Sequence, residues 1–307
     1  MTLSGTLRPV DRLMVLFNIG FGVLWLAGLG RVPAAPWLVF GHAAGVLLAW
    51  LAGRLGPGAS PIGRGLRELY PIVLISLYWL EMGLVRHGFH DGTYDAVIAV
   101  ADRWMSGGTH LQLLWMPAMP WVWFSEMMYA VYWLYYPMVF GTPLALLLWR
   151  RPSLQPFVFR VTLAYVACYV SYAIFPVDGP SHTMEKFVGP HMEGFFYNLV
   201  VSGTHAADSM GTAFPSSHVV GAVTAALIAV QWFSRPWAVV FLLGALGVAL
   251  STVYTQSHFA IDSVIGIVFA VVLYYPVAPA LERLLGGEPA PMPSVADTAP
   301  SSPAGSS

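Results

Sequence analysis

The stretch Thr212–Val230, TAFPSSHVVGAVTAALIAV, joins two kinds of sequence. From Val219 onward it is an apolar run of the kind that crosses a lipid bilayer. Ahead of that run stand Pro215, two serines and His218. Ionisable and polar side chains are costly inside a membrane and are usually kept there for function. The stretch therefore predicts a membrane helix whose first turn belongs to a functional site.

The composition of the chain indicates that a bilayer surrounds most of it. Of the 307 residues, 57% are hydrophobic and only 9% are charged, whereas a soluble domain carries about 25% charged residues. The net charge of -1 gives no reason to expect nucleic acid as a partner. The one cysteine, Cys168, excludes an internal disulfide bond.

The apolar runs predict an all-α, polytopic membrane protein with about eight transmembrane helices, since a spanning helix needs about 20 mostly apolar residues. The fourth run is overlong and contains Pro137 and Pro143, which predicts a kink or a tilt. The second run is short and rich in glycine, so seven spans with a different start remain an alternative. The predicted spans are residues 13–30, 36–53, 69–86, 119–149, 157–176, 213–233, 236–253 and 259–284.

Charged residues and histidines are distributed unequally between the two predicted sides of the membrane. Ten of the fourteen lysines and arginines fall on the side that carries both termini, which is typical of the cytoplasmic side. Eight of the nine histidines, all except His42, lie on the opposite side or at its rim. Two long loops on that side, 87–118 and 177–212, hold most of the polar residues. We therefore predict an integral protein of the cell membrane with cytoplasmic termini and an active site on the non-cytoplasmic face.

A second informative stretch is Leu250–Ala270, LSTVYTQSHFAIDSVIGIVFA. It places His258 and Asp262 at the start of the last predicted span, and residues four apart share one face of a helix. Two predicted spans thus begin with an imidazole on the same side of the membrane. We expect the ring nitrogens of His218 and His258 to lie within about 5–8 Å of each other, around one phosphate-sized space.

This set of side chains suits phosphoryl transfer without a metal or any other cofactor. A neutral imidazole can attack phosphorus, while a carboxylate on its other nitrogen fixes the tautomer. A second histidine can protonate the leaving oxygen and later take a proton from the incoming hydroxyl. Ser216 and the amides of the helix start can hold phosphoryl oxygens. Ser216 can also act as a helix N-cap, and the two roles are compatible.

At these residues the chain resembles the type 2 phosphatidic acid phosphatase (PAP2) superfamily, which also holds vanadium haloperoxidases and sphingolipid phosphotransferases. Pro215, Ser216 and His218 match the family pattern Pro-Ser-Gly-His, and Ser251, His258 and Asp262 match the pattern Ser-Arg-x5-His-x3-Asp. The resemblance implies a nucleophilic His258, an orienting Asp262 and a general acid and base at His218. The phosphate- and substrate-binding residues that we expect are Ser216, Ser217, Ser251, Lys186, His182 and Asp178.

The chain departs from the family pattern at three places. Ser217 replaces the motif glycine, Thr252 stands where the family usually has an arginine, and no Lys-x6-Arg-Pro motif is found. The same losses make the chain look like the inositol phosphorylceramide synthase branch of inositolphosphotransferases, as do the stretches 125–137 and 175–182. The missing arginine leaves the cation that holds phosphate open. The candidates, with the first ranked highest, are Lys186, Arg103, Arg86 and His182.

The resemblance also predicts how the chain is divided and what it does. We expect N-terminal transmembrane helices and an outer loop at 1–118, a PAP2-like catalytic core at 119–285 and a disordered tail at 286–307. The expected function is cleavage of a lipid phosphoester through a phosphohistidine, in the manner of an inositolphosphotransferase. Its expected partners are a membrane lipid with a phosphorylated headgroup and the bilayer itself. The alternatives are a phosphatase for isoprenoid diphosphate or phosphatidic acid, and a transporter or scaffold that reuses the fold without catalysis.

Overall fold

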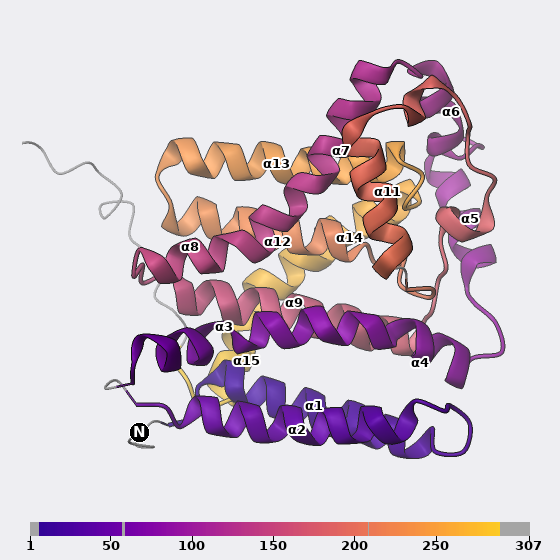
Figure 1. The fold of residues 1–307 in the computed structure, drawn as a ribbon. Coiled ribbons are helices and arrows are strands. Elements are labelled where there is room, and N and C mark those ends of the chain that lie inside the picture. The colour runs from indigo at the N-terminus through magenta and orange to yellow at the C-terminus, as the bar shows by residue number, and fades with distance from the viewer. Residues whose placement is uncertain (1–5, 57–58, 208, 289–307) are drawn as a thin grey trace, which may run out of the picture.

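The computed structural model describes residues 6–56, 59–207 and 209–288, and this part of the chain is almost entirely helical (Figure 1). The predicted disordered tail lies outside the described residues from 289 onward. The helical elements are α1 Pro9–Ala27, α2 Ala35–Gly53, α3 Pro61–Tyr78, η1 Trp79–Glu81, α4 Met82–Phe89, α5 Asp95–Met105, α6 Leu111–Ala118, α7 Val122–Tyr136, η2 Pro137–Gly141, α8 Thr142–Leu148, α9 Leu154–Ile174, α10 Pro180–Thr183, η3 Pro190–Met192, α11 Phe195–Ala207, α12 Ser217–Trp232, α13 Arg235–Tyr254, α14 Ala260–Val272, η4 Leu273–Val277 and α15 Ala278–Leu284.

The prediction of a helical polytopic membrane protein is confirmed. Seven helical segments of the described chain are long and apolar enough to cross a membrane. The remaining predicted span, 213–233, corresponds to the shorter apolar helix α12 of 16 residues. That helix starts only at Ser217 because Thr212 forms an isolated β-bridge with Val177 and residues 213–216 form turns, and the side chain of Ser216 caps the first turn of the helix.

Among the spans, the third departs furthest from its predicted bounds. The third begins at Pro61 rather than at residue 69, because Ser60 caps the helix and Pro61 occupies its first turn, where a proline is tolerated. The fourth contains a π-helical turn at η2, where the predicted kink falls. Pro137 has no backbone N–H to donate, so the regular hydrogen-bond ladder is interrupted there. The polar segment between the third and fourth spans forms the short helices α5 and α6.

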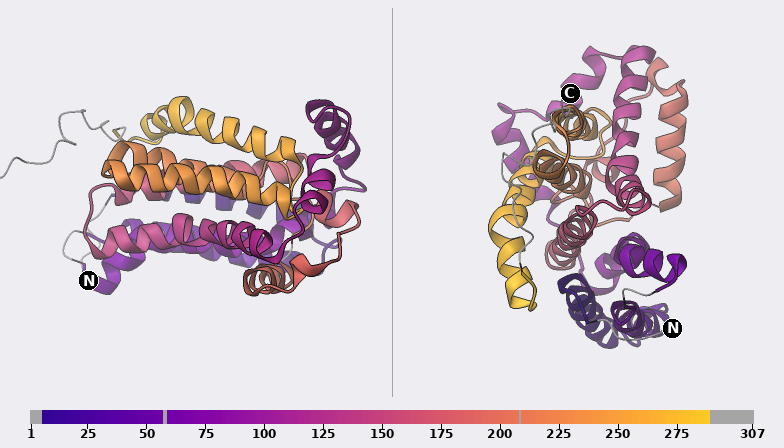
Figure 2. Two further views of the ribbon diagram at one scale, coloured as in Figure 1. Left: turned by 90° about the horizontal axis from the view of Figure 1, so that it is seen from above. Right: turned by 90° about the vertical axis from the view of Figure 1, so that its left-hand side faces the viewer.

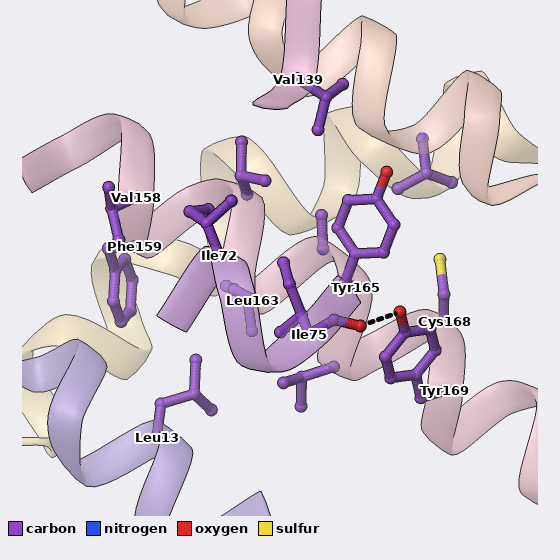
Figure 3. Packing of buried hydrophobic residues seen from close by; sticks show 14 of the residues in the cluster. Leu13, Ile72, Ile75, Val139, Val158, Phe159, Leu163, Tyr165, Cys168 and Tyr169 are labelled. Carbon is purple, nitrogen blue, oxygen red and sulfur yellow. Dashed lines mark hydrogen bonds between the residues drawn. The ribbon is translucent and has the colours of Figure 1, made fainter. Parts of the chain in front are cut away.

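Helix α9 runs through the middle of the bundle, with the α1–α2 hairpin at one edge and α13 at the other (Figures 1 and 2). Most side chains of α9 are buried. Figure 3 shows its Tyr165 and Tyr169 beside Ile75 of α3 and Val139 of η2. The hydroxyl of Tyr169 donates to the backbone oxygen of Ile75 at 2.6 Å. A tyrosine buried in a membrane helix thus has its polar end satisfied by a neighbouring helix.

The α1–α2 hairpin is joined to α3 and η1 by a buried polar cluster. The His42 ring lies 3.0 Å from Asn18 Oδ1 through Nδ1 and 3.1 Å from Glu81 Oε2 through Nε2. Trp25 Nε1 donates to the same Glu81 oxygen at 2.9 Å. Gly45 allows the close approach, since a Cβ there would overlap the Asn18 side chain. Within a membrane such groups are costly unless each finds a partner, so the cluster fixes how the hairpin docks.

The two ends of the bundle differ. Helices α5, α6 and α11 gather at one of them, which we call the loop end (Figure 1). At the other, the terminal end, α1 begins and α15 ends: Arg12 donates to the backbone oxygen of Leu285. Arg160 of α9 and Glu282 of α15 form an ion pair of 3.6 Å at the same end. The start and the end of the helical bundle therefore lie on one side.

Candidate active site

A cavity of about 860 Å³ opens at the loop end, between α3, α7, α9 and α11. Both His218 and His258 line it. Its walls are rich in phenol side chains: seven tyrosines contribute, from α7, α9 and α11. These tyrosines are Tyr129, Tyr132, Tyr135, Tyr136, Tyr165, Tyr169 and Tyr197.

The two histidines are carried to one place by the starts of α12 and α14. His218 is the second residue of α12, and His258 lies in the turn just before α14. The amide of Ser216 donates to the backbone oxygen of Asp262 at 3.3 Å, which joins the two helix starts directly. Gly266 leaves room for this approach, because a Cβ there would stand 3.3 Å from the backbone oxygen of Ser216. The imidazole centroids are 5.9 Å apart and the rings are inclined at 63°.

The Nδ1 atom of His258 has two oxygen neighbours. The backbone oxygen of Ala213 is 2.9 Å away, and Asp262 Oδ2 is 3.5 Å away. The sequence predicts the carboxylate as the orienting partner, but the carbonyl is the closer of the two. Asp262 Oδ2 accepts the amide of Phe259 at 2.8 Å, which holds the carboxylate back. Donation from Nδ1 to the carbonyl leaves the lone pair of a neutral His258 on Nε2, and the carboxylate at 3.5 Å stabilises an imidazolium.

His218 is held from the side of α7. Its Nε2 atom lies 3.1 Å from the hydroxyl oxygen of Tyr132, and the Tyr135 ring packs against it with centroids 4.5 Å apart. Its Nδ1 atom is buried and has no hydrogen-bond partner among the described residues. Buried polar atoms nearly always have a partner, so an orphaned ring nitrogen in a cavity wall indicates a place for a ligand atom. Tyr132 could not be singled out from the sequence, because its aromatic neighbourhood is typical of membrane packing.

Of the three predicted phosphate-binding serines, the structure brings only Ser217 to the cavity wall. Ser216 is fully buried and its hydroxyl accepts the amide of Val219, so it acts as the N-cap of α12. Ser251 is also fully buried, and its hydroxyl donates to the backbone oxygen of Val248, one turn back in α13. The motif spacing is retained, but the hydroxyls of Ser216 and Ser251 are turned into the helices that carry them.

Of the four candidate cations for holding phosphate, two line the cavity. Lys186 and His182 line the cavity. Arg86 does not line it and instead pairs with the cavity residue Asp178, with 3.1 Å between Nη2 and Oδ2. Arg103 does not line it either. Burial lowers the pKa of another lining residue, His191, which leaves that ring neutral at pH 7.

The segment that carries Lys186 is fastened to the turn that carries His258. Gln256 Oε1 accepts the amide of Phe187 at 3.2 Å. Gln256 itself has a φ of 55°, in the left-handed region that non-glycine residues rarely adopt. Asp95 fixes the other end of the segment by accepting the amide of Gly179 at 2.7 Å. The segment that carries Lys186, the only lysine of the chain and a cavity-lining residue, is thus held at both ends.

Residues 96–276, more than half of the chain, match the family model described as PAP2 superfamily. The chain belongs to the PAP2 superfamily. No match was found among curated proteins or among solved structures. Membership supports a phosphatase-type function related to lipids. The two histidines and Asp262 of this PAP2 protein lie inside the matched region, and so do α5 and α6.

The region that matches the PAP2 family model also contains a buried pair of side chains that could not be predicted from the sequence. This pair is Asp102 of α5 and His110. Asp102 is fully buried, with Oδ2 2.6 Å from His110 Nδ1. Its Oδ1 accepts the amide of Ile261 in the first turn of α14, at 3.1 Å. The His110 ring packs on Phe259 with centroids 5.4 Å apart. The pair therefore braces the PAP2 turn 258–262 from behind, without lining the cavity.

We expect Asp102→Ala to lower the turnover of the folded protein by roughly 10–100-fold and also to lower its melting temperature, because buried His110 loses its partner. The amide of Ile261 loses its acceptor, so the turn before α14 shifts, and a misplacement of about 1 Å can cost about 100-fold in rate. Asp91→Ala, in the same polar segment but exposed, is the control and should leave the rate unchanged. A positioning role requires a fall in kcat with KM retained. Equal losses in both variants, or a loss of folded protein alone, would contradict it.

Proposed function

We propose that this PAP2 protein moves the phosphorylated headgroup of a membrane lipid, through a covalent intermediate on His258, to a second hydroxyl compound. The observation that carries the proposal is the His218–His258 pair, 5.9 Å between centroids, with the unpartnered Nδ1 of His218 in the wall of the same cavity. Two imidazoles at this separation can flank one phosphorus atom as nucleophile and general acid.

The proposed reaction has two steps. Nε2 of His258 attacks phosphorus, the bond from phosphorus to the lipid oxygen breaks, and that oxygen takes a proton from His218. The acceptor hydroxyl then gives its proton to His218 and attacks the same phosphorus, and the phosphorus–nitrogen bond breaks. Lys186 and the amides at the start of α12 stabilise the charge on the phosphoryl oxygens in both steps. Asp262 stabilises the imidazolium character that His258 gains.

A lipid donor is favoured by the way the cavity meets the membrane-facing surface. Leu80 of η1 and Tyr136 of α7 both line the cavity, and they are 60% and 39% exposed. A lipid that enters between these elements would keep its acyl chains in the bilayer while its headgroup reaches the histidines. The polar wall formed by Thr255, Gln256 and Ser257 offers hydroxyl and amide groups to a polyol headgroup.

Transfer is favoured over hydrolysis by the tyrosine-rich lining and by the departures from the PAP2 pattern at Ser217 and Thr252. Thr252 does not line the cavity, and its hydroxyl lies 3.0 Å from that of Ser263. A site that grips a dianionic phosphate monoester needs strong cationic contacts, whereas a phosphodiester such as an inositol phospholipid carries one negative charge. Lys186 with a helix N-terminus matches the lower charge. The proposal also includes the membrane topology: both termini lie in the cytoplasm, and the cavity lies on the other side of the membrane.

The test uses the purified full chain in nanodiscs with phosphatidylinositol labelled in its inositol phosphate. We expect acid-labile labelling of the protein, and label appearing in a new lipid only when an acceptor such as ceramide is added. Release of inorganic phosphate from phosphatidic acid or from an isoprenoid diphosphate, without headgroup transfer, would favour the phosphatase alternative. Absence of turnover and of labelling on all three donors would favour a transporter or scaffold.

A further inference from the structure

A second hollow, of about 710 Å³, lies between the α7–η2–α8 segment and α13, with the end of α12 at its side. It is at the terminal end of the bundle, away from α5 and α6 (Figure 1). Most of its lining is apolar, including Trp149, Trp232 and Phe241. Of the described residues that line it, none is acidic. We call this hollow the α8–α13 groove.

The polar residues of the groove come from the turns at its terminal end. Arg151 and Ser153 lie in the α8–α9 turn, and Ser234 lies in the α12–α13 turn. Arg151 is exposed, and its guanidinium forms no ion pair with any of the described residues. Ser153 is 4% exposed, and its hydroxyl does not cap the first turn of α9. A serine hydroxyl in the wall of a groove that caps no helix can donate a hydrogen bond to a ligand.

The gradient from polar to apolar along the groove matches a phospholipid. The apolar part lies beside helices that cross the bilayer, where no water is present to fill a hollow. The exposed indoles of Trp149 and Trp237 flank the polar part, as is typical of the headgroup level. A packed helix is about 10–12 Å wide with a pitch of 5.4 Å, so one turn fills roughly 500 Å³. The groove therefore admits little more than one turn of a second protein helix, whereas an acyl chain fits along it.

The charge around the polar end selects the headgroup. Arg151 lines the groove, and Arg235 is exposed next to the lining residue Ser234. Basic pockets between transmembrane helices bind anionic lipid headgroups. We propose that the α8–α13 groove binds one anionic phospholipid, with its phosphate on Arg151 and Ser153 and an acyl chain along α13.

This site is separate from the catalytic cavity. The 16 residues of α12 run from the cavity at Ser217 to the groove at Trp232, a distance of about 24 Å at 1.5 Å per residue. Around η2 the two hollows lie on different faces of one helix: Tyr136 and Phe140 line the cavity, and Pro137 lines the groove. A lipid in the groove is thus not the donor held at the histidines.

The test uses the purified full chain in phosphatidylcholine nanodiscs with a trace of phosphatidylglycerol that carries a diazirine in one acyl chain. After illumination, we expect labelled peptides from 137–153 and 232–241. Labelling should fall by about fivefold in Arg151→Gln, because one arginine contributes about this factor to the binding of anionic lipid. It should fall at least as far in Val240→Trp, which fills the groove without changing any charge. Arg150→Gln, the neighbouring arginine outside the lining, is the matched control and should keep full labelling.

Several results would overturn the proposal. Equal labelling by a phosphatidylcholine probe would show no selection of an anionic headgroup. An equal loss in Arg150→Gln would indicate diffuse surface charge, and labels confined to cavity residues would place the lipid elsewhere. Cross-links between two copies of the chain across the groove would identify a protein as the occupant. Melting temperature and gel filtration of each variant separate loss of binding from loss of fold, and Arg151→Gln and Val240→Trp disturb different properties of the groove.

Discussion

His258→Ala abolishes formation of the phosphoenzyme and lowers turnover on the order of 10⁴–10⁶-fold, the range seen when a nucleophile is removed from an enzyme that forms a covalent intermediate. Alanine supplies no lone pair to attack phosphorus. The folded protein should survive, because His258 contributes mainly one hydrogen bond, from Nδ1 to the backbone oxygen of Ala213. The measurement is acid-quenched labelling with a radioactive lipid donor, beside the rate of product formation.

The control for this variant is His87→Ala. His87 lies on the same end of the molecule but is exposed and does not line the cavity. It should retain both the phosphoenzyme and the rate. A phosphoenzyme that persists at normal level in His258→Ala would assign the nucleophile to another residue. Loss of labelling in both variants would point to general damage of the loop end.

The fold class could be predicted because it depends on composition. A chain with 9% charged residues cannot cover a water-facing surface, and apolar runs of spanning length leave few arrangements other than a helical bundle. Helix bounds were less predictable. The third span was predicted to begin at residue 69, after Arg64 and Arg67, yet Ser60 and Pro61 provide the local signals that start α3 ahead of these arginines. Two arginines at the end of a spanning helix can extend toward the membrane surface, so their charge does not prevent the helix.

The meeting of His218 and His258 could also be predicted, because each sits where a membrane helix begins and both helices begin at the same end. The directions of individual side chains could not. Ser251 lies near the end of α13, shortly before the loop that carries His258. Its hydroxyl nevertheless donates to the backbone oxygen of Val248 in the same helix. A short side chain near a helix end can satisfy itself locally, and the pattern does not distinguish this from ligand binding.

Contacts between distant parts of the chain carry no local signal at all. Asp102 and Ile261 are 159 residues apart, and no periodicity or motif connects them. The same holds for Tyr132 and His218, 86 residues apart, which meet only because α7 packs beside the start of α12. The residues that support the two histidines can therefore be identified only from the packing of the helices, whereas the histidines themselves can be identified from the sequence.

The second large effect is expected at His218, and it should depend on the leaving group. We expect His218→Gln to lower turnover of a natural phospholipid by about 10²–10⁴-fold, the usual contribution of a general acid and base. A lipid alkoxide is a poor leaving group and needs the proton of His218. A synthetic donor with a nitrophenyl leaving group does not, so its first step should be nearly as fast as in the wild-type protein. Because the second step still needs a base, the phosphoenzyme should accumulate with that donor.

Tyr132→Phe is the matched control for this prediction. It keeps the ring beside His218 but removes the hydroxyl that lies 3.1 Å from Nε2, so the loss should be about 5–10-fold, the scale of one hydrogen bond. The decisive quantity is the ratio of the rates for the two donors. If His218→Gln slows the nitrophenyl donor as strongly as the phospholipid, His218 does not act on the leaving oxygen. The orphaned Nδ1 atom in the cavity wall would then serve binding of the phosphoryl group, and KM rather than kcat would carry the loss.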